Sequence, residues 1–440
     1  MKPRALTIPF AIVVAALVVG LRGSAAPPDY REIAIDAAKW IRSARVQTPF
    51  GIAWPSDPRD PKSFSTALYS GSPGVVLFML ELYQATGERS YFDEARHGAD
   101  DLLTKVSNVR DMGLYEGVAG LGFTLGETWR ATTDDKYRRA AVRAVKVLSD
   151  TALPGEGGVQ WSNTTDIIAG SAGIGLFLLY ADDVLHDQTA RPLAIRAGGR
   201  LLQLGIEDKG GLKWAMEPSF PRLMPNFSHG TAGVAYFLAS LYKTTRDKRF
   251  LDGALAGARY LQAIAKTEGD ICLVQHNQPE GLDLYYLGWC HGPVGTSRLF
   301  YQLYKVTNDE VWMTWVRKAA NGILTSGIPE QRTPGFWNNV SQCCGSAGVA
   351  QFFLDLYGVT KDQKYLAFAD RMTADLLARA TRDGLGTRWV QAEHRVKPEL
   401  LVAQTGYMQG AAGISVWLLR LDAAERGRAP FVRFPDSPWP

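Results

Sequence analysis

The sequence predicts an all-helical fold in which seven helical hairpins close into a ring. Two observations carry this prediction. A short glycine motif recurs seven times along the chain. Each copy opens a run of large apolar residues, and an amphipathic stretch follows that run. Such internal repetition is typical of folds that stack one helical unit on the next.

The glycine motif reads Gly-x-x-Gly. Its copies are separated by 46 to 65 residues and begin at Gly71, Gly117, Gly170, Gly230, Gly292, Gly345 and Gly410. Two glycines at this spacing let a loop turn sharply and lie close to a neighbouring backbone. We therefore expect each motif to mark the point where a loop enters a helix.

Each unit is predicted to be an inner helix followed by an outer helix. The run after each motif is apolar nearly all round, which is typical of a helix that is buried on both sides. A short polar turn, such as residues 85–88 or 244–247, ends the run. An outer helix should follow, because residues 93–105, 136–149 and 249–267 carry apolar side chains at three- and four-residue spacing.

The segments between hairpins, such as residues 153–165 and 328–342, are rich in Gly, Pro, Asn and Trp and are expected to be irregular. Stacked hairpins can form an open solenoid or a closed ring. Closure is favoured because it gives every inner helix a neighbour on both flanks. In a closed ring all the motifs share one mouth, and the residues just before them line one cavity.

Composition narrows the class of protein. The chain has 440 residues, is 46% hydrophobic and carries 48 basic and 44 acidic residues. Three of the basic residues lie in the N-terminal leader, so the body is close to neutral. This balance is typical of a globular protein and gives no support for a nucleic-acid partner. We expect a single domain over residues 27–440 and a monomer.

The N-terminus reads as a secretory signal peptide over residues 1–26. Lys2 and Arg4 precede an apolar run over residues 5–21, and small residues follow at 23–26. The predicted protein is therefore exported. It would be membrane-anchored if the leader stays uncleaved, because the run reaches the short end of what spans a bilayer. The rest of the chain has no second run of spanning length.

The four cysteines are Cys272, Cys290, Cys343 and Cys344. Cys290 and Cys343 occupy the same position, two residues before the motif, in adjacent repeats. A closed ring would bring these two and Cys344 together. Three thiolates with a fourth position open to water or substrate are typical of a catalytic zinc site. Cys272 or His291 could supply a fourth ligand, and a Cys290–Cys343 disulfide is the alternative in an exported protein.

These motifs together resemble the lanthionine synthetase C-like family over about residues 65–421. The resemblance rests on the seven Gly-x-x-Gly repeats and on Trp289-Cys290-x-Gly292, Cys343-Cys344-Gly345, Ser228-His229-Gly230 and Asp166-x-x-x-Gly170. It implies a double toroid of seven inner and seven outer helices around a Zn²⁺ ion. The best-known members cyclise peptides: zinc binds a substrate cysteine thiolate, which adds to a dehydroalanine or dehydrobutyrine to form a thioether.

The resemblance also implies roles for individual residues. Cys290 and Cys343 match the family's two zinc cysteines, and Cys344 stands where the third ligand is usually His. Some members are similar in using three cysteines. A third thiolate adds negative charge and leaves a bound substrate thiolate more nucleophilic.

His229 looks like the family's active-site His, which would protonate the enolate or deprotonate the thiol. Asp166 looks like the catalytic Asp, which would orient or assist. The residues alone leave simpler interpretations open: His229 as a helix-entry residue that caps its own loop, and Asp166 as an N-cap or loop acid.

Two positions depart from the family pattern. Tyr286 stands where the family often has Arg, which would stabilise an enolate oxyanion. His291 stands where a Tyr often follows the first zinc cysteine. His291 could replace the Arg as a donor, serve as a second base, bind metal, or simply be a polar loop residue.

The sequence thus favours a zinc-dependent enzyme that adds a thiol to an electrophile in a peptide, with a peptide or small thiol as substrate. A non-catalytic zinc protein that binds thiols or peptides is one alternative. A carbohydrate-active toroid is another, with Glu116 and Asp166 as paired carboxylates. The tryptophans available for sugar stacking would be Trp161, Trp214, Trp289, Trp337 and Trp389.

Overall fold

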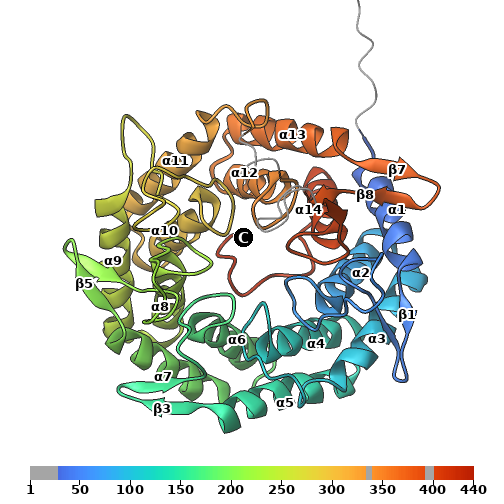
Figure 1. Cartoon of the computed structure of the whole chain (residues 1–440), viewed down its shortest axis with the longest axis horizontal. Coiled ribbons are helices and arrows are strands. Elements are labelled where there is room, and N and C mark those ends of the chain that lie inside the picture. The colour runs from blue at the N-terminus through green and yellow to red at the C-terminus, as the bar shows by residue number, and fades with distance from the viewer. Residues whose placement is uncertain (1–27, 333–338, 392–400) are drawn as a thin grey trace, which may run out of the picture.

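The computed structural model describes residues 28–332, 339–391 and 401–440, which form one ring of two helical layers (Figure 1). The inner layer consists of α2 (Ser72–Thr86), α4 (Val118–Thr132), α6 (Ser171–Val184), α8 (Thr231–Thr245), α10 (Pro293–Thr307), α12 (Ser346–Thr360) and α14 (Ala411–Glu425). The outer layer consists of α1 (Tyr30–Ser43), α3 (Arg89–Leu103), α5 (Asp135–Thr151), α7 (Ala190–Gln203), α9 (Lys248–Ile264), α11 (Glu310–Leu324) and α13 (Gln363–Ala378). The predicted double toroid is confirmed.

The two ends of the chain close the ring. Six inner helices pack against the outer helix that follows them, as predicted. The prediction is wrong for α14, whose outer partner is α1, from the other end of the chain. α14 also packs against both of its inner neighbours, α2 and α12, so the inner layer is a closed ring and not an open solenoid.

The turns between inner and outer helices follow one plan. Five inner helices end on a residue in the left-handed conformation, with φ between 56° and 75°: Gly87, Thr133, Arg246, Asn308 and Lys361. The next residue is the N-cap of the outer helix. In four of these turns it is an aspartate whose carboxylate accepts a backbone N–H of the first turn. This cap stabilises the start of the outer helix and sets its boundary.

The connecting segments are less irregular than predicted. Residues 153–165 contain an antiparallel hairpin, β3 (Leu153–Gly155) and β4 (Gly158–Gln160). The other paired strands are β1 (Val46–Gln47) with β2 (Ile52–Ala53), β5 (Ile206–Asp208) with β6 (Gly211–Lys213), β7 (Thr381–Asp383) with β8 (Gly386–Arg388), and β9 (Val390–Gln391) with β10 (Val402–Ala403). In β3–β4, the two-residue turn is possible because Gly157 adopts a φ of 78°.

The glycine motif is explained by how closely each loop crosses the helix that it enters. The carbonyl oxygen of the residue six positions earlier lies against the second glycine of the motif. A Cβ atom on Gly120 would come within 2.2 Å of the Leu114 oxygen, and one on Gly413 within 1.8 Å of the Tyr407 oxygen. Only glycine leaves room for this contact.

The seven loops are joined edge to edge by backbone hydrogen bonds that form a closed belt at the mouth. In six repeats the residue two positions before the motif donates its N–H to the equivalent carbonyl of the next repeat; in the third repeat the donor is one residue earlier. In order around the ring, the N–H to C=O pairs are Tyr69–Tyr115 (2.9 Å), Tyr115–Ile168 (2.9 Å), Ile167–Ser228 (3.2 Å), Ser228–Cys290 (3.0 Å), Cys290–Cys343 (3.3 Å), Cys343–Met408 (2.9 Å) and Met408–Tyr69 (2.8 Å).

The C-terminal segment, residues 427–440, runs into the centre of the ring (Figure 1). Its side chains Phe434, Asp436 and Trp439 are buried there. Asp436 forms an ion pair of 2.7 Å with Arg298 of α10, and Glu81 of α2 accepts the backbone N–H of Val432 at 2.8 Å. The ring axis is therefore filled by the chain's own end.

The leader predicted over residues 1–26 lies outside the described residues, so the signal peptide stays a prediction. Among the helices that the structure describes, none combines the length and the apolar character needed to cross a membrane.

The close crossing at the motif predicts that its glycines cannot be replaced. Gly120→Ala should lower the free energy of unfolding by about 1–3 kcal/mol, because the new methyl group overlaps the Leu114 carbonyl. Gly358→Ala in α12 is the matched control, since a Cβ there would meet no atom within 4 Å. It should be neutral or stabilising by up to about 1 kcal/mol. Urea unfolding of both variants tests this, and equal effects would contradict the explanation.

Candidate metal centre

Three cysteine side chains meet at the mouth, in the loops that enter α10 and α12. The Cys344 sulfur lies 3.0 Å from the Cys290 sulfur and 3.3 Å from the Cys343 sulfur. All three sulfur atoms lie within 4.8 Å of one another, and all three residues are buried. The belt causes this meeting, because the N–H groups of Trp289 and Cys290 both bond to the Cys343 carbonyl.

The fourth cysteine takes no part in this cluster. Cys272 is buried elsewhere, with its backbone N–H bonded to the Lys318 carbonyl of α11. Burial raises the pKa of its thiol to about 12. None of the four cysteines, all of which lie in the described residues, forms a disulfide, so the structure shows neither the Cys290–Cys343 disulfide nor a disulfide of Cys272.

The chemistry of the cluster fits a thiophilic metal ion. The pKa of Cys343 lies well below its usual value, because Cys290 and Cys344 donate hydrogen bonds to its sulfur and Tyr69 adds another. The cluster thus already favours one thiolate. Tetrahedral zinc with Zn–S bonds near 2.3 Å places its sulfurs about 3.8 Å apart, so these thiols need to separate by less than about 1 Å to bind it. Three protein sulfurs would leave the fourth position open.

His229 and Asp166 form a pair beside the cysteine cluster. The Nδ1 atom of His229 lies 2.6 Å from Asp166 Oδ2. The other carboxylate oxygen of Asp166 accepts the N–H groups of Ala169 and Gly170, each at 2.9 Å. Asp166 therefore closes the turn before α6 and contacts His229 at the same time. It is a loop acid and not the N-cap, because Gly170 is the N-cap of α6 and no side chain caps that helix. The His229 ring is held by Asp166, while its side chain keeps 29% exposure.

This pairing changes the charge state of the histidine. Burial alone would lower the pKa of His229, but the hydrogen bond and the charge of Asp166 outweigh it. Cys343 and Glu116 add to the effect, and the pKa of His229 lies above its usual value. His229 lies near the cysteine loops, because its neighbour Ser228 donates its N–H to the Cys290 carbonyl at 3.0 Å.

His291 belongs to a group of imidazoles around the same loops. Its ring centroid lies 5.5 Å from that of His229 and 4.4 Å from that of His276. The tilted rings of His276 and Tyr286 pack with their centroids 4.2 Å apart. Sequence analysis missed His276, because it lies far from any motif and no repeat position marks it. It also missed Tyr69, although Tyr69 occupies the same motif position as Cys290 and Cys343.

The tryptophans proposed for sugar stacking have structural roles. Trp214, Trp289 and Trp389 are at most 2% exposed. The indole N–H groups of Trp161, Trp214 and Trp389 each donate to a leucine carbonyl thirteen residues earlier, near the end of an outer helix. Trp289 donates to Asp436 at 3.1 Å. Trp337 lies outside the described residues. The described tryptophans therefore provide no wall of exposed ring faces for a sugar.

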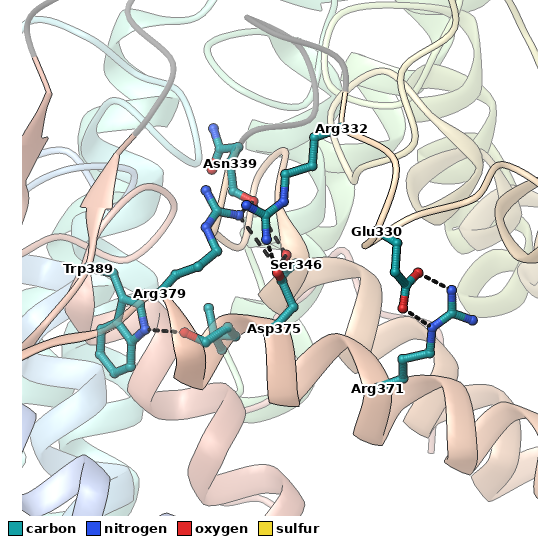
Figure 2. A network of polar contacts seen from close by, with 9 residues as sticks. Glu330, Arg332, Asn339, Ser346, Arg371, Asp375, Arg379 and Trp389 are labelled. Carbon is teal, nitrogen blue, oxygen red and sulfur yellow. Dashed lines mark hydrogen bonds and ion pairs between the residues drawn. The ribbon is translucent and has the colours of Figure 1, made fainter.

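A polar network ties the second cysteine loop to the outer layer (Figure 2). Asp375 of α13 accepts the Ser346 hydroxyl at 3.2 Å and pairs with both Arg332 and Arg379. Arg379 also donates to the Asn339 carbonyl at 3.3 Å. The loop that carries Cys343 and Cys344 is thus fixed from the outside by α13 and from the inside by the belt.

The fold is a helical double toroid with a three-cysteine cluster at its mouth. The family model for lanthionine synthetase C-like protein matches residues 62–434, and the chain belongs to this family. Nisin cyclase superposes with a TM-score of 0.66 at 16% identity, covering 92% of this chain and 96% of its own.

Two further solved structures are similar in fold. A protein from Listeria innocua has a TM-score of 0.52 at 13% identity, covering 91% of this chain and 99% of its own. A family 76 glycoside hydrolase α-mannanase from Bacteroides thetaiotaomicron has a TM-score of 0.51 at 11% identity, covering 91% and 97%. At these identities the likeness shows the fold alone.

The His229–Asp166 pair makes a prediction about protonation. Asp166→Asn keeps an oxygen for the N–H groups of Ala169 and Gly170 but removes the negative charge, so the pKa of His229 should fall and its titration should move to lower pH. The shift should be about one pH unit or more, as expected for the loss of a close charged partner. NMR titration of the histidine ring protons measures it. An unchanged His229 midpoint would contradict the assigned pairing.

Proposed function

We propose that the chain is a zinc-dependent enzyme that adds a thiol to a dehydroamino acid in a peptide and so forms a thioether. The observation that carries this proposal is the juxtaposition of a buried three-cysteine cluster with the His229–Asp166 pair. Cys290, Cys343 and Cys344 would hold the zinc. When bound, the ion would keep a substrate thiol in its thiolate form at neutral pH.

His229 is proposed to handle the proton. The sulfur electron pair forms the bond to the β-carbon of the alkene, and the π electrons move to the α-carbon to give an enolate. A protonated His229 then donates its proton to that carbon. The substrate thiol has released its own proton to solvent, and His229 takes one up from solvent afterwards, so the product is an isomer of the substrate. Burial lowers the pKa of His229, but Asp166 raises it overall, so a larger share of the imidazole is protonated than in an unperturbed histidine. Asp166 fixes the orientation of the ring throughout.

The enolate oxygen needs a donor, and the family's usual Arg is replaced by Tyr286. We propose His291 for this role, because its ring lies beside His229 and the residue follows Cys290 directly in the chain. His276 packs against His291 and would fix its orientation. An imidazole N–H aimed at a developing negative charge lowers the barrier in a site that excludes water.

Export through residues 1–26 remains part of the proposal. An exported chain would meet an oxidising compartment, where close thiols tend to form disulfides. A bound metal would protect the three cysteines from disulfide formation. The proposed substrate is a peptide or a small thiol, and the proposed assembly is a monomer.

The alternatives have less support. Asp166 is buried and committed to His229 and to the start of α6, so it is poorly placed to act with Glu116 as a pair of hydrolytic carboxylates. A non-catalytic zinc protein would use the same cysteines but would have no need for a protonated histidine beside them. Turnover by His229 variants separates that alternative from the enzyme.

The metal proposal predicts one zinc ion for each chain. Cys343→Ala should lose it, because two sulfurs do not complete the site. Cys272→Ala is the matched control: it also removes a buried thiol, and it should keep the zinc. Elemental analysis of the purified proteins measures both. Zinc retained in Cys343→Ala, or absent from the unaltered chain after refolding with zinc under reducing conditions, would refute the site.

The catalytic proposal predicts that His229→Asn separates metal binding from turnover. The probe is a synthetic peptide that contains one dehydroalanine and one cysteine. Cyclisation leaves its mass unchanged but protects the thiol from alkylation, so mass spectrometry after iodoacetamide treatment follows the reaction. His229→Asn should keep its zinc and cyclise about 10²-fold more slowly or worse. An equal rate would show that another group, with His291 first to be tested, handles the proton.

A further inference from the structure

The face of the ring opposite the mouth contains a large cavity that the proposed function does not use. Its volume is about 1050 Å³, and it is lined by the C-terminal ends of inner helices and by the C-terminal segment. We call it the basal cavity. Its size matches the upper range of small-molecule sites. α10 starts just after the cysteine loop, and Lys305 is its thirteenth residue, so the level of Lys305 lies roughly 18 Å along the helix from that loop. The cavity extends from there toward the middle of the inner helices.

Buried side chains separate the basal cavity from the mouth. Phe434, Asp436 and Trp439 of the C-terminal segment fill the ring axis between them. Arg298 and Trp289 hold Asp436 in place from the mouth side. A ligand in the cavity would therefore occupy a site of its own.

The cavity wall carries several cations without counter-ions. Lys243 of α8, Lys305 of α10, Lys361 next to α12 and Arg433 of the C-terminal segment line it. None of the four forms an ion pair with a described acidic residue. Lys305 donates to the Pro438 carbonyl at 2.7 Å, which leaves its charge uncompensated. Burial, and then repulsion by Lys243 and Arg433, lowers the pKa of Lys305.

Helix geometry explains only part of this charge. Lys243 and Lys305 lie in the last turns of α8 and α10, where a cation stabilises the partial negative charge of the helix end. Arg433 belongs to no helix, yet it adds to the same group. Among the acidic groups of the wall, Asp182 pairs with Arg191, and the remaining ones are Asp183, Asp355 and the terminal carboxylate of Pro440.

Asp355 does little to neutralise the group. Burial raises the pKa of Asp355 to about 7, although the charges of Arg420 and Arg298 oppose this shift. Its carboxyl is therefore protonated in a large part of the molecules at neutral pH. It can then donate a hydrogen bond instead of repelling an anion.

The cavity wall also holds a buried acceptor. Gln351 of α12 is 8% exposed, and its amide oxygen has no hydrogen-bond partner among the described residues. A buried polar atom of this kind points to a group that completes it, either water or a ligand. Gln351 is the sixth residue of α12, whereas Lys243 and Lys305 are the thirteenth residues of α8 and α10, so the two levels differ by roughly 10 Å along the ring axis. A ligand that meets both groups must therefore extend along that axis.

We propose that the basal cavity binds a small molecule that carries a phosphate or carboxylate group and a hydrogen-bond donor. The anionic group lies among Lys243, Lys305 and Arg433, and the donor reaches the Gln351 oxygen. Charge-assisted hydrogen bonds from lysine and arginine are the strong contacts that such anions use in proteins. The same anionic chemistry occurs in free metabolites and in lipid headgroups.

Calorimetric titration of the zinc-loaded protein with inorganic phosphate and with succinate, at fixed ionic strength in chloride, tests the proposal. Both anions should bind, and Lys243→Gln/Lys305→Gln should weaken binding by about tenfold or more, the scale of losing charge-assisted hydrogen bonds. Lys39→Gln, on the exposed face of α1, is the matched control and should bind as the unaltered protein does. Cys343→Ala should also bind normally, which excludes binding to the metal.

Two outcomes would overturn the proposal: no binding above that of chloride, or equal binding by the double variant. Zinc content confirms that the double variant still folds. Gln351→Leu serves as an uncharged second variant; it should weaken binding of glycerol 3-phosphate, which carries hydroxyl donors, more than binding of phosphate. Vesicles of phosphatidylcholine with phosphatidylserine identify the source. If the unaltered protein binds the vesicles and the double variant does not, the ligand is a lipid headgroup. If the protein binds only the soluble anions, the ligand is a free metabolite.

Discussion

The closed belt of backbone hydrogen bonds is the constraint on which the rest of the structure depends. Each loop must bond to two neighbours and also cross the first turn of its own inner helix. Both demands place backbone against backbone, which is why the motif glycines cannot carry a side chain. The belt also builds the metal centre. The backbone N–H of Cys290 is hydrogen-bonded to the Cys343 carbonyl within the belt, and this contact brings their sulfur atoms close together.

The C-terminal segment supplies the second constraint, since a ring of seven helices leaves space along its axis. The buried Asp436 forms an ion pair with Arg298 of α10. It also accepts a hydrogen bond from the indole N–H of Trp289, the residue before Cys290. Removing one partner of a buried ion pair costs about 3–5 kcal/mol, because the other charge stays behind without water. The end of the chain is therefore coupled to the loop that carries the first cysteine.

The sequence could predict whatever the repeat makes periodic. The seven motifs located the inner helices, the shared mouth and the three cysteines, because each depends on the same position in each unit. The sequence could not predict structural features that occur only once and have no counterpart in the other repeats. The pairing of α14 with α1, the path of residues 427–440 and the place of His276 depend on tertiary contacts that leave no periodic trace. Tyr69 is the intermediate case, since its motif position was visible but its residue type did not suggest a ligand.

The shared direction of the inner helices gives the two faces of the ring different chemistry. All seven inner helices start at the belt, so their partially positive ends surround the mouth. That field favours anions, and the thiolate of Cys343 and the carboxylate of Asp166 both lie there. The opposite ends are partially negative and attract lysines, as Lys243 and Lys305 show. Those lysines line the cavity that the C-terminal segment closes, and Arg433 adds a third cation from outside any helix. Compensation of the helix ends therefore accounts for part of the cationic lining on the face opposite the thiolates.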